Sequence, residues 1–202
     1  MKKIIVFIFF LSVSFAWSQE KINIFETKTM TFYGLDFTHA KFIGTKKLPN
    51  PESLVNKYYP IWNNMFMTDE IDLEIGGPYK KKEVFYDTLV YSRNAQIDLK
   101  EIIIDHDYSL NRSDVNEYLL SFASPHKSGL GMVYLVESLN ATEKYLSIWI
   151  TFFDIKTGEV LLTEPLRVKG KGRKFKYWWK NAFLELFDKS KKDYKAWKKI
   201  YQ

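Results

Sequence analysis

The fold is decided by residues 129–169, GLGMVYLVESLNATEKYLSIWITFFDIKTGEVLLTEPLRVK. This stretch predicts three consecutive strands joined by two tight turns, at residues 132–139, 145–153 and 159–163. The first two strands are apolar on both faces, which is typical of strands that helices cover on both sides of a sheet. Gly158 can adopt the positive φ that closes the second hairpin, and Pro165 either ends the third strand or confines it to a sheet edge. We therefore expect an antiparallel meander at the core of the protein.

The remaining elements follow from hydrophobic spacing along the chain. We expect a strand at residues 28–38 and helices at residues 53–67, 113–122 and 175–201. Pro60 should kink or split the first of these helices. Residues 83–91 are ambiguous: their β-branched and aromatic content favours a strand, although a helix face also fits. Residues 98–105 form either a short buried strand or the end of a helix.

Together these elements predict an α/β (α+β) fold. We expect one mixed sheet with a C-terminal antiparallel three-strand meander, helices packed on it and a long C-terminal helix. The length of the chain favours a single domain over residues 19–202.

Residues 1–18 have the features of a secretory signal peptide. Lys2 and Lys3 are followed by an apolar run at residues 4–15, and Ala16 and Ser18 are the small residues that a signal peptidase recognises. We expect cleavage near Ser18/Gln19 and a periplasmic or secreted protein. No later apolar run is long enough to span a bilayer, so the mature chain should have no transmembrane span.

The chain contains no cysteine. This excludes disulfides, thiolate metal sites, a thiol nucleophile and the lipid-modified cysteine of a bacterial lipoprotein. The fold must therefore depend on a hydrophobic core, which the 17% aromatic content can supply.

Basic residues gather at the C-terminal end. Residues 164–202 carry 13 Lys or Arg and four Asp or Glu, a net charge of +9 in a chain whose formal net charge is +6. The candidate binding residues are Arg167, Lys169, Lys171, Arg173, Lys174, Lys191, Lys195, Lys198 and Lys199. Export makes nucleic acid an unsuitable partner, so we expect an envelope protein or an anionic membrane or polymer surface. The alternative is a lysine face that only keeps the protein soluble.

Catalysis is the competing hypothesis, and it depends on carboxylates at strand ends. The candidates are Asp36, Asp105 and Glu137. Each has a structural alternative: Asp36 would bond a loop amide, Glu137 would pair with a Lys or Arg, and Asp105 would belong to a polar turn. The sequence has no phosphate-binding loop, nucleophile elbow or zinc-binding helix motif, and we expect no metal or cofactor. A non-enzymatic protein is therefore favoured.

Two parts of the chain resemble known exported proteins. Residues 133–153, followed by Asp-Ile-Lys-Thr-Gly at 154–158 and an aromatic final helix, resemble conserved exported Gram-negative bacterial proteins of unknown function. The order of elements, with Leu35-Asp36-Phe37 ending the first strand, is similar to the periplasmic α/β domain of the curli-secretion lipoprotein and the penicillin-binding-protein-activator lipoproteins. This resemblance implies an envelope protein without catalytic residues. Those proteins carry a lipidation cysteine that this chain lacks, so their membrane anchoring does not carry over to this chain.

Overall fold

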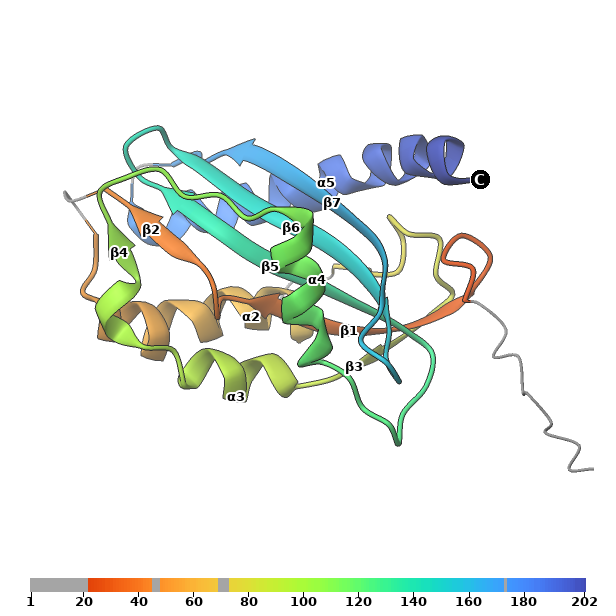
Figure 1. The fold of residues 1–202 in the computed structure, drawn as a ribbon. Helices are drawn as coiled ribbons and strands as arrows, with labels where there is room; N and C mark the ends of the chain where they lie inside the picture. The colour runs from red at the N-terminus through yellow and green to blue at the C-terminus, as the bar shows by residue number, and fades with distance from the viewer. Residues whose placement is uncertain (1–21, 45–47, 69–72, 173) are drawn as a thin grey trace, which may run out of the picture.

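The computed structural model describes residues 22–44, 48–68, 73–172 and 174–202 (Figure 1). The expected signal peptide at residues 1–18 and the candidate Arg173 lie outside these residues. The strands are β1 (Thr29–Asp36), β2 (Lys41–Ile43), β3 (Glu83–Tyr86), β4 (Ile103–Ile104), β5 (Leu130–Asn140), β6 (Tyr145–Asp154) and β7 (Val160–Lys169). The helices are α1 (Pro51–Ser53), η1 (Leu54–Tyr58), α2 (Tyr59–Met67), α3 (Leu89–Ala95), η2 (Leu99–Glu101), α4 (Arg112–Leu120) and α5 (Phe175–Tyr201).

All seven strands belong to one curled sheet with β5 at its centre. β1 and β2 pair in parallel with successive parts of one edge of β5, and β3 and β4 pair in parallel with β1 and β2. β6 and β7 continue the sheet on the other side of β5 in antiparallel order. The expected mixed α/β sheet is confirmed, whereas the meander accounts for only part of it, because four of the six strand pairs among the described residues are parallel.

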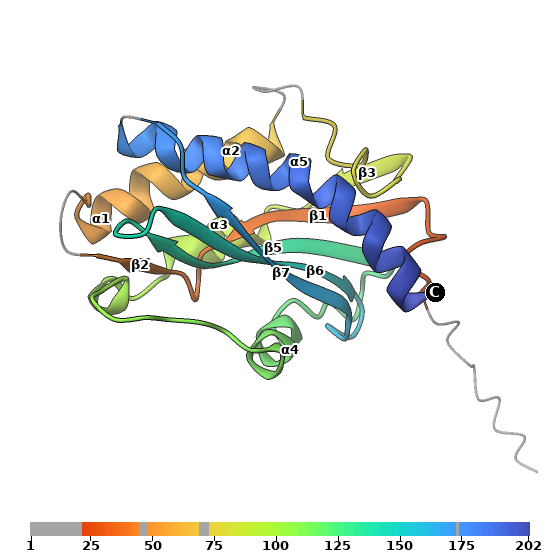
Figure 2. The same ribbon diagram turned by 90° about the horizontal axis from the view of Figure 1, so that it is seen from above.

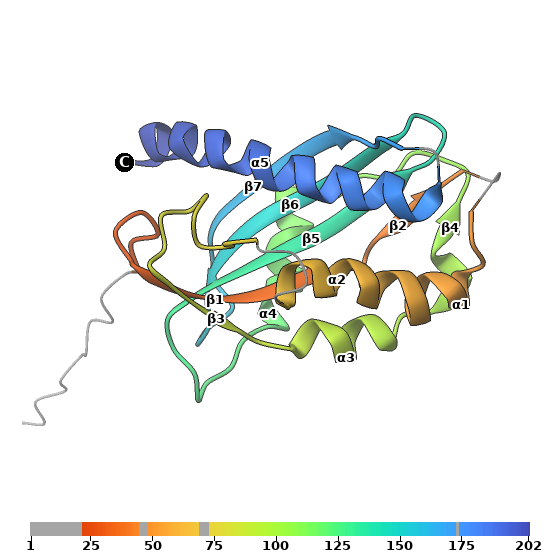
Figure 3. The same ribbon diagram turned by 180° about the vertical axis from the view of Figure 1, so that it is seen from behind.

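Helices cover both faces of the sheet, as the two-sided apolar strands predict. α5 and α2 lie on one face and α4 lies on the opposite face (Figure 2). α3 runs beside α2 along the rim formed by β1 (Figure 3). The side chains of β5 alternate between two apolar clusters: Met132 and Tyr134 pack under α5 and α2, while Val133 and Leu135 pack toward α4. The core therefore has two layers, separated by the sheet.

The boundaries of several elements differ from the sequence-based expectation. The strand favoured at residues 83–91 ends at Tyr86, because the carboxylate of Asp87 accepts a hydrogen bond from Leu89 N and α3 begins there. The third meander strand runs through Pro165 to Lys169, ten residues instead of five. η1 is a π-helix, which has a wider turn than an α-helix, and it ends two residues before Pro60. The helix therefore changes from π to α geometry next to the proline. The short parallel strand β2 was not expected.

Pro165 does lie on an edge strand, as one of the two alternatives predicted. Within the described ranges β7 pairs with β6 and with no other strand. Arg112 donates to the Thr163 carbonyl, and Lys189 Nζ lies 3.5 Å from the Arg167 carbonyl. Because Pro165 also lacks an N–H, little of this edge is free for pairing with another chain.

Two buried asparagines hold the end of β1 where β3 has stopped. Gly34 has φ +91°, and the ladder between β1 and β5 shifts register at this point. Asn63 of α2 accepts from Leu35 N at 2.7 Å and donates to Leu35 O at 2.9 Å. Asn94 of α3 donates to the same carbonyl and accepts from Phe37 N. The two side chains replace the missing strand as hydrogen-bond partners of the backbone.

Asn63→Leu is expected to lower the free energy of unfolding by about 1–3 kcal/mol, because Leu35 N is then buried without an acceptor. The Leu35 carbonyl keeps Asn94, so the loss should stay within that range. Urea unfolding of the two proteins measures the difference. Asn56→Leu, at an exposed position of η1, is the control and should change the midpoint little. Equal midpoints for both variants would contradict this role of Asn63.

Candidate functional site

The lysines expected to form a band do lie on one side of α5. Trp179, Phe183 and Leu186 of this helix are fully buried against the sheet. Lys191, Lys195, Lys198 and Lys199 follow at intervals of four, three and one residues on another side, and all but the half-buried Lys198 are exposed. Among the described residues, the side-chain ion pairs of α5 are Lys171–Glu185 and Lys189–Asp193, so none of the four lysines is neutralised by a carboxylate.

The other candidate basic residues are divided between different surfaces. Arg167 and Lys169 point from β7 to the face of the sheet opposite α5, because Leu166 and Val168 occupy the α5 side. Arg167 pairs with Glu143 at 2.6 Å and lies 4.1 Å from the centroid of the Tyr145 ring. Lys171 pairs with Glu185 at 2.7 Å, and Lys174 is the residue that precedes α5. The eight candidates within the described residues therefore do not form one continuous surface.

The three candidate carboxylates have separate environments. Asp36 is buried, accepts from Thr38 N and pairs with Arg93 Nε at 2.8 Å. This confirms its structural alternative, a strand-end carboxylate that bonds a loop amide. Asp105 is exposed and lies 3.3 Å from Nδ1 of the neighbouring His106. The described residues hold no group of three or more acidic or histidine side chains arranged to bind a metal ion.

Glu137 has a different environment from the one expected. Its Oε2 accepts from Leu110 N at 3.0 Å and from Trp149 Nε1 at 2.8 Å. The expected Lys or Arg partner is therefore wrong. Glu137 follows Val133 and Leu135 in the alternation of β5, so it points to the face that α4 covers only in part. A register shift between Val136 and Ser138 turns Ser138 to the same face. The Glu137 carboxylate lines a cavity there.

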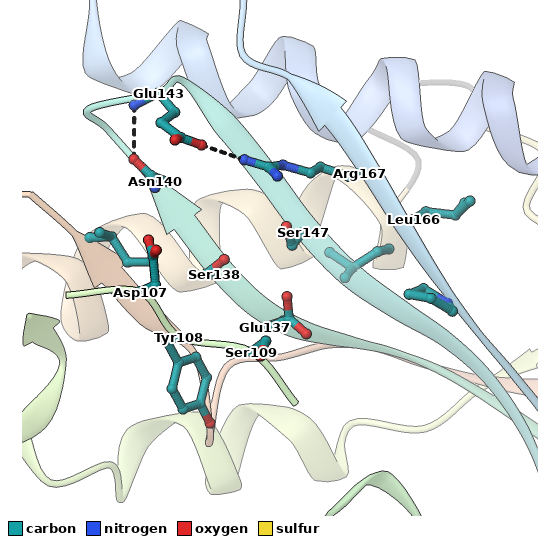
Figure 4. A pocket seen from close by; sticks show the side chains of 13 residues that line it. Asp107, Tyr108, Ser109, Glu137, Ser138, Asn140, Glu143, Ser147, Leu166 and Arg167 are labelled. Carbon is teal, nitrogen blue, oxygen red and sulfur yellow. Dashed lines mark hydrogen bonds and ion pairs between the residues drawn. The ribbon is translucent and has the colours of Figure 1, made fainter. Parts of the chain in front are cut away.

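This cavity of about 480 Å³ lies over the ends of β5, β6 and β7 (Figure 4). Ser138, Ser147 and Arg167 stand at paired positions across these three strands and form its floor. The segment Asp107-Tyr108-Ser109 passes beside Glu137 and forms one wall. Glu143 and Arg167 meet at the rim, where about half of each side chain is exposed.

The cavity contains polar groups that the protein itself leaves without partners. Ser138 is 4% exposed and Asn140 is 7% exposed. Asn140 Oδ1 accepts from Thr142 N and Glu143 N, but its Nδ2 has no partner in the described part of the chain. The hydroxyls of Ser138 and Ser147 also have no protein partner there. These atoms are not among the fully buried side-chain atoms without a partner in the described residues, so they are accessible from the cavity and can bond a polar ligand or water.

Sequence reasoning identified Glu137 and Arg167 but not the remaining cavity residues. The available signal was Ser138 and Ser147, polar residues within two mostly apolar strands. The register shift in β5 decides which face Ser138 points to, and the sequence did not predict that shift.

No protein-family model and no curated protein matches the chain. One similar structure is the C-terminal domain of LpoB from Salmonella enterica, with a TM-score of 0.28 and 8% sequence identity, covering 70% of this chain and 82% of that chain. LpoB is a penicillin-binding-protein activator lipoprotein. Within the described residues, no helix is long and apolar enough to cross a membrane.

Proposed function

We propose that this is a non-catalytic exported protein that docks on an acidic envelope protein through α5. One observation carries the proposal: Lys191, Lys195, Lys198 and Lys199 share one side of the helix and have no carboxylate partner among the described residues. Unpaired positive charges on a rigid element attract an acidic surface and orient it as it approaches.

The packing of α5 favours an acidic protein over a membrane as the partner. A helix that lies in a membrane interface needs a free apolar face. The apolar stripe of α5 is already occupied, since Trp179, Phe183 and Trp197 pack against the sheet. The lysines can therefore make electrostatic contact with a surface, whereas insertion into a bilayer would require the helix to leave the core.

The positions of the carboxylates favour binding over catalysis. Asp36 is engaged by Arg93 and a loop amide, Asp105 is exposed, and Glu137 lines a cavity that includes neither of them. A pair of carboxylates that share acid–base work must reach the same substrate. The three candidates have no such common site.

The quadruple variant with Lys191, Lys195, Lys198 and Lys199 changed to Gln is expected to bind its envelope partner about tenfold or more weakly. Exposed charge pairs are worth roughly 0.2–1 kcal/mol each, so four of them together account for a loss of this size. The measurement is binding of purified protein to envelope extract, with the retained proteins identified by mass spectrometry, across a salt series. Retention should fall as salt rises, because the Debye length shrinks from about 10 Å at 0.1 M to about 3 Å at 1 M.

The control removes the same charge from other elements, with Lys57, Lys82, Lys100 and Lys156 changed to Gln; all four are exposed. It should bind like the original protein. A second experiment uses vesicles with and without anionic lipid. If salt-sensitive binding is seen with anionic vesicles but not with envelope protein, the partner of the lysines is a membrane. If neither salt nor the quadruple substitution changes the binding, the lysines only keep the protein soluble.

A further inference from the structure

We propose that the cavity over the ends of β5, β6 and β7 is a binding site for a saccharide of one or two rings that is uncharged or carries an amine. This site lies on the face of the sheet opposite α5 and is independent of the proposed docking through the lysines. A volume of about 480 Å³ falls within the range of small-molecule sites in proteins, roughly 300–1,000 Å³.

The site is already assembled without a ligand. Glu137 is held in place because its Oε2 accepts from both Leu110 N and Trp149 Nε1, which leaves Oε1 without a partner in the described part of the chain. Asn140 is fixed in the same way through its Oδ1, which leaves Nδ2 available to donate. Side chains fixed by such contacts lose little conformational entropy when a ligand binds.

The polar groups alternate between donors and acceptors. The Asn140 amide donates, the Glu137 carboxylate accepts, and the hydroxyls of Ser138 and Ser147 can do either. A sugar ring presents hydroxyls that each donate and accept, and it fits such a surface better than a ligand with acceptors alone. The floor, formed by neighbouring strands, also suits a ring-shaped ligand.

Charge decides against an acidic ligand. Among the described residues, the lining contains the carboxylates of Asp107, Glu137 and Glu143 and one cation, Arg167, which is paired with Glu143. The remaining carboxylates give the cavity a negative balance. An acidic sugar would meet repulsion, whereas an amine would be attracted.

The test is a titration of isotope-labelled protein with N-acetylglucosamine, glucosamine and glucuronic acid, followed by amide and indole NMR signals. The first two sugars should shift the signals of Ser138, Ser147 and Asn140 and the indole N–H of Trp149. Glucuronic acid should shift them at least about tenfold more weakly than glucosamine. No shift at the cavity with either of the first two, or equal binding of glucuronic acid, would overturn the proposal.

Matched serine variants locate the site. Replacing both Ser138 and Ser147 with Ala should weaken glucosamine binding about tenfold, since two hydrogen bonds are lost. Ser128→Ala, at an exposed position of the loop before β5, should bind like the original protein. Undiminished binding by the double variant would exclude this cavity. If that variant does not fold, the indole signal of Trp149 in the original protein still shows whether the sugar binds in this cavity, because the indole N–H contacts Glu137 directly.

Discussion

Between about pH 10 and pH 12 the protein is expected to unfold, because tyrosines that the fold keeps neutral ionise readily in the unfolded chain. Burial raises the pKa of Tyr33 and Tyr194 to about 12 and raises the pKa values of Tyr59, Tyr79 and Tyr134 further. An unfolded tyrosine ionises near pH 10. Stability from these groups is therefore fully present below about pH 10 and is lost as pH rises through their folded pKa values.

The expected effect is large. Each such tyrosine lowers the free energy of unfolding by about 1.4 kcal/mol per pH unit above about pH 10, so five give roughly 7 kcal/mol per unit. A typical domain has only about 5–15 kcal/mol in total. Urea unfolding at a series of pH values, followed by circular dichroism, measures the slope. A stability that stays level from pH 10 to pH 12 would contradict the burial of these rings.

One buried lysine acts in the opposite direction. Lys81 Nζ donates to the carbonyls of Ile24 and Thr27, and burial lowers its pKa to about 8. Between about pH 8 and pH 10 the unfolded chain holds more protons than the folded protein at this group, so stability should rise slightly before the tyrosines reverse the trend. Lys81 is one group against five tyrosines, so the tyrosines determine how the free energy of unfolding changes with pH above about pH 10.

Tyr59→Phe is a selective test of the alkaline transition. The Tyr59 hydroxyl is buried and has no hydrogen-bond partner among the described residues, so removing it sacrifices no contact. The variant should be as stable as the original at neutral pH, or about 1 kcal/mol more stable, and its alkaline slope should be shallower by about 1.4 kcal/mol per unit. Tyr177→Phe, at an exposed ring of α5, is the control and should leave the slope unchanged.

Phe152→Ala is expected to lower the free energy of unfolding by about 3–5 kcal/mol, because it empties a fully buried ring position. Phe152 points from β6 into the layer under α5, where it contacts the rings of Tyr79 and Tyr194. Trp149→Ala probes the layer on the α4 side and should cause a loss of the same size, since the variant also removes the indole donor from Glu137. Denaturant midpoints measure both variants.

The control for these core variants is Phe85→Ala. This ring is 53% exposed on β3, so its removal deletes the same atoms without opening a cavity. It should change the midpoint little. Midpoints that stay unchanged in both Phe152→Ala and Trp149→Ala would mean that β6 does not lie at the centre of the core.

The sequence by itself determined the elements whose signals are local. The two-sided apolar pattern at residues 145–153 predicted a strand covered on both faces, and β6 has this environment. Gly158 was expected to take a positive φ in the second turn, and it does, at +74°. The aromatic spacing after residue 175 predicted the buried stripe of α5. In each case neighbouring residues carry the information, because periodicity and backbone conformation are set within a few positions.

Only the tertiary structure decided the features that join distant parts of the chain. Asn63 and Asn94 complete the hydrogen bonds of β1, and nothing near Leu35 in the sequence points to them. The register shift beside Glu137 turned Ser138 to the same face as that carboxylate, and the partners of Glu137 come from residues 110 and 149. In β7 the alternation of side chains places Arg167 on the face opposite α5, although Arg167 and α5 belong to the same basic stretch of sequence. Strand register and side-chain direction depend on how the whole sheet pairs, so a linear charge count could locate the basic residues but could not show which of them share a surface.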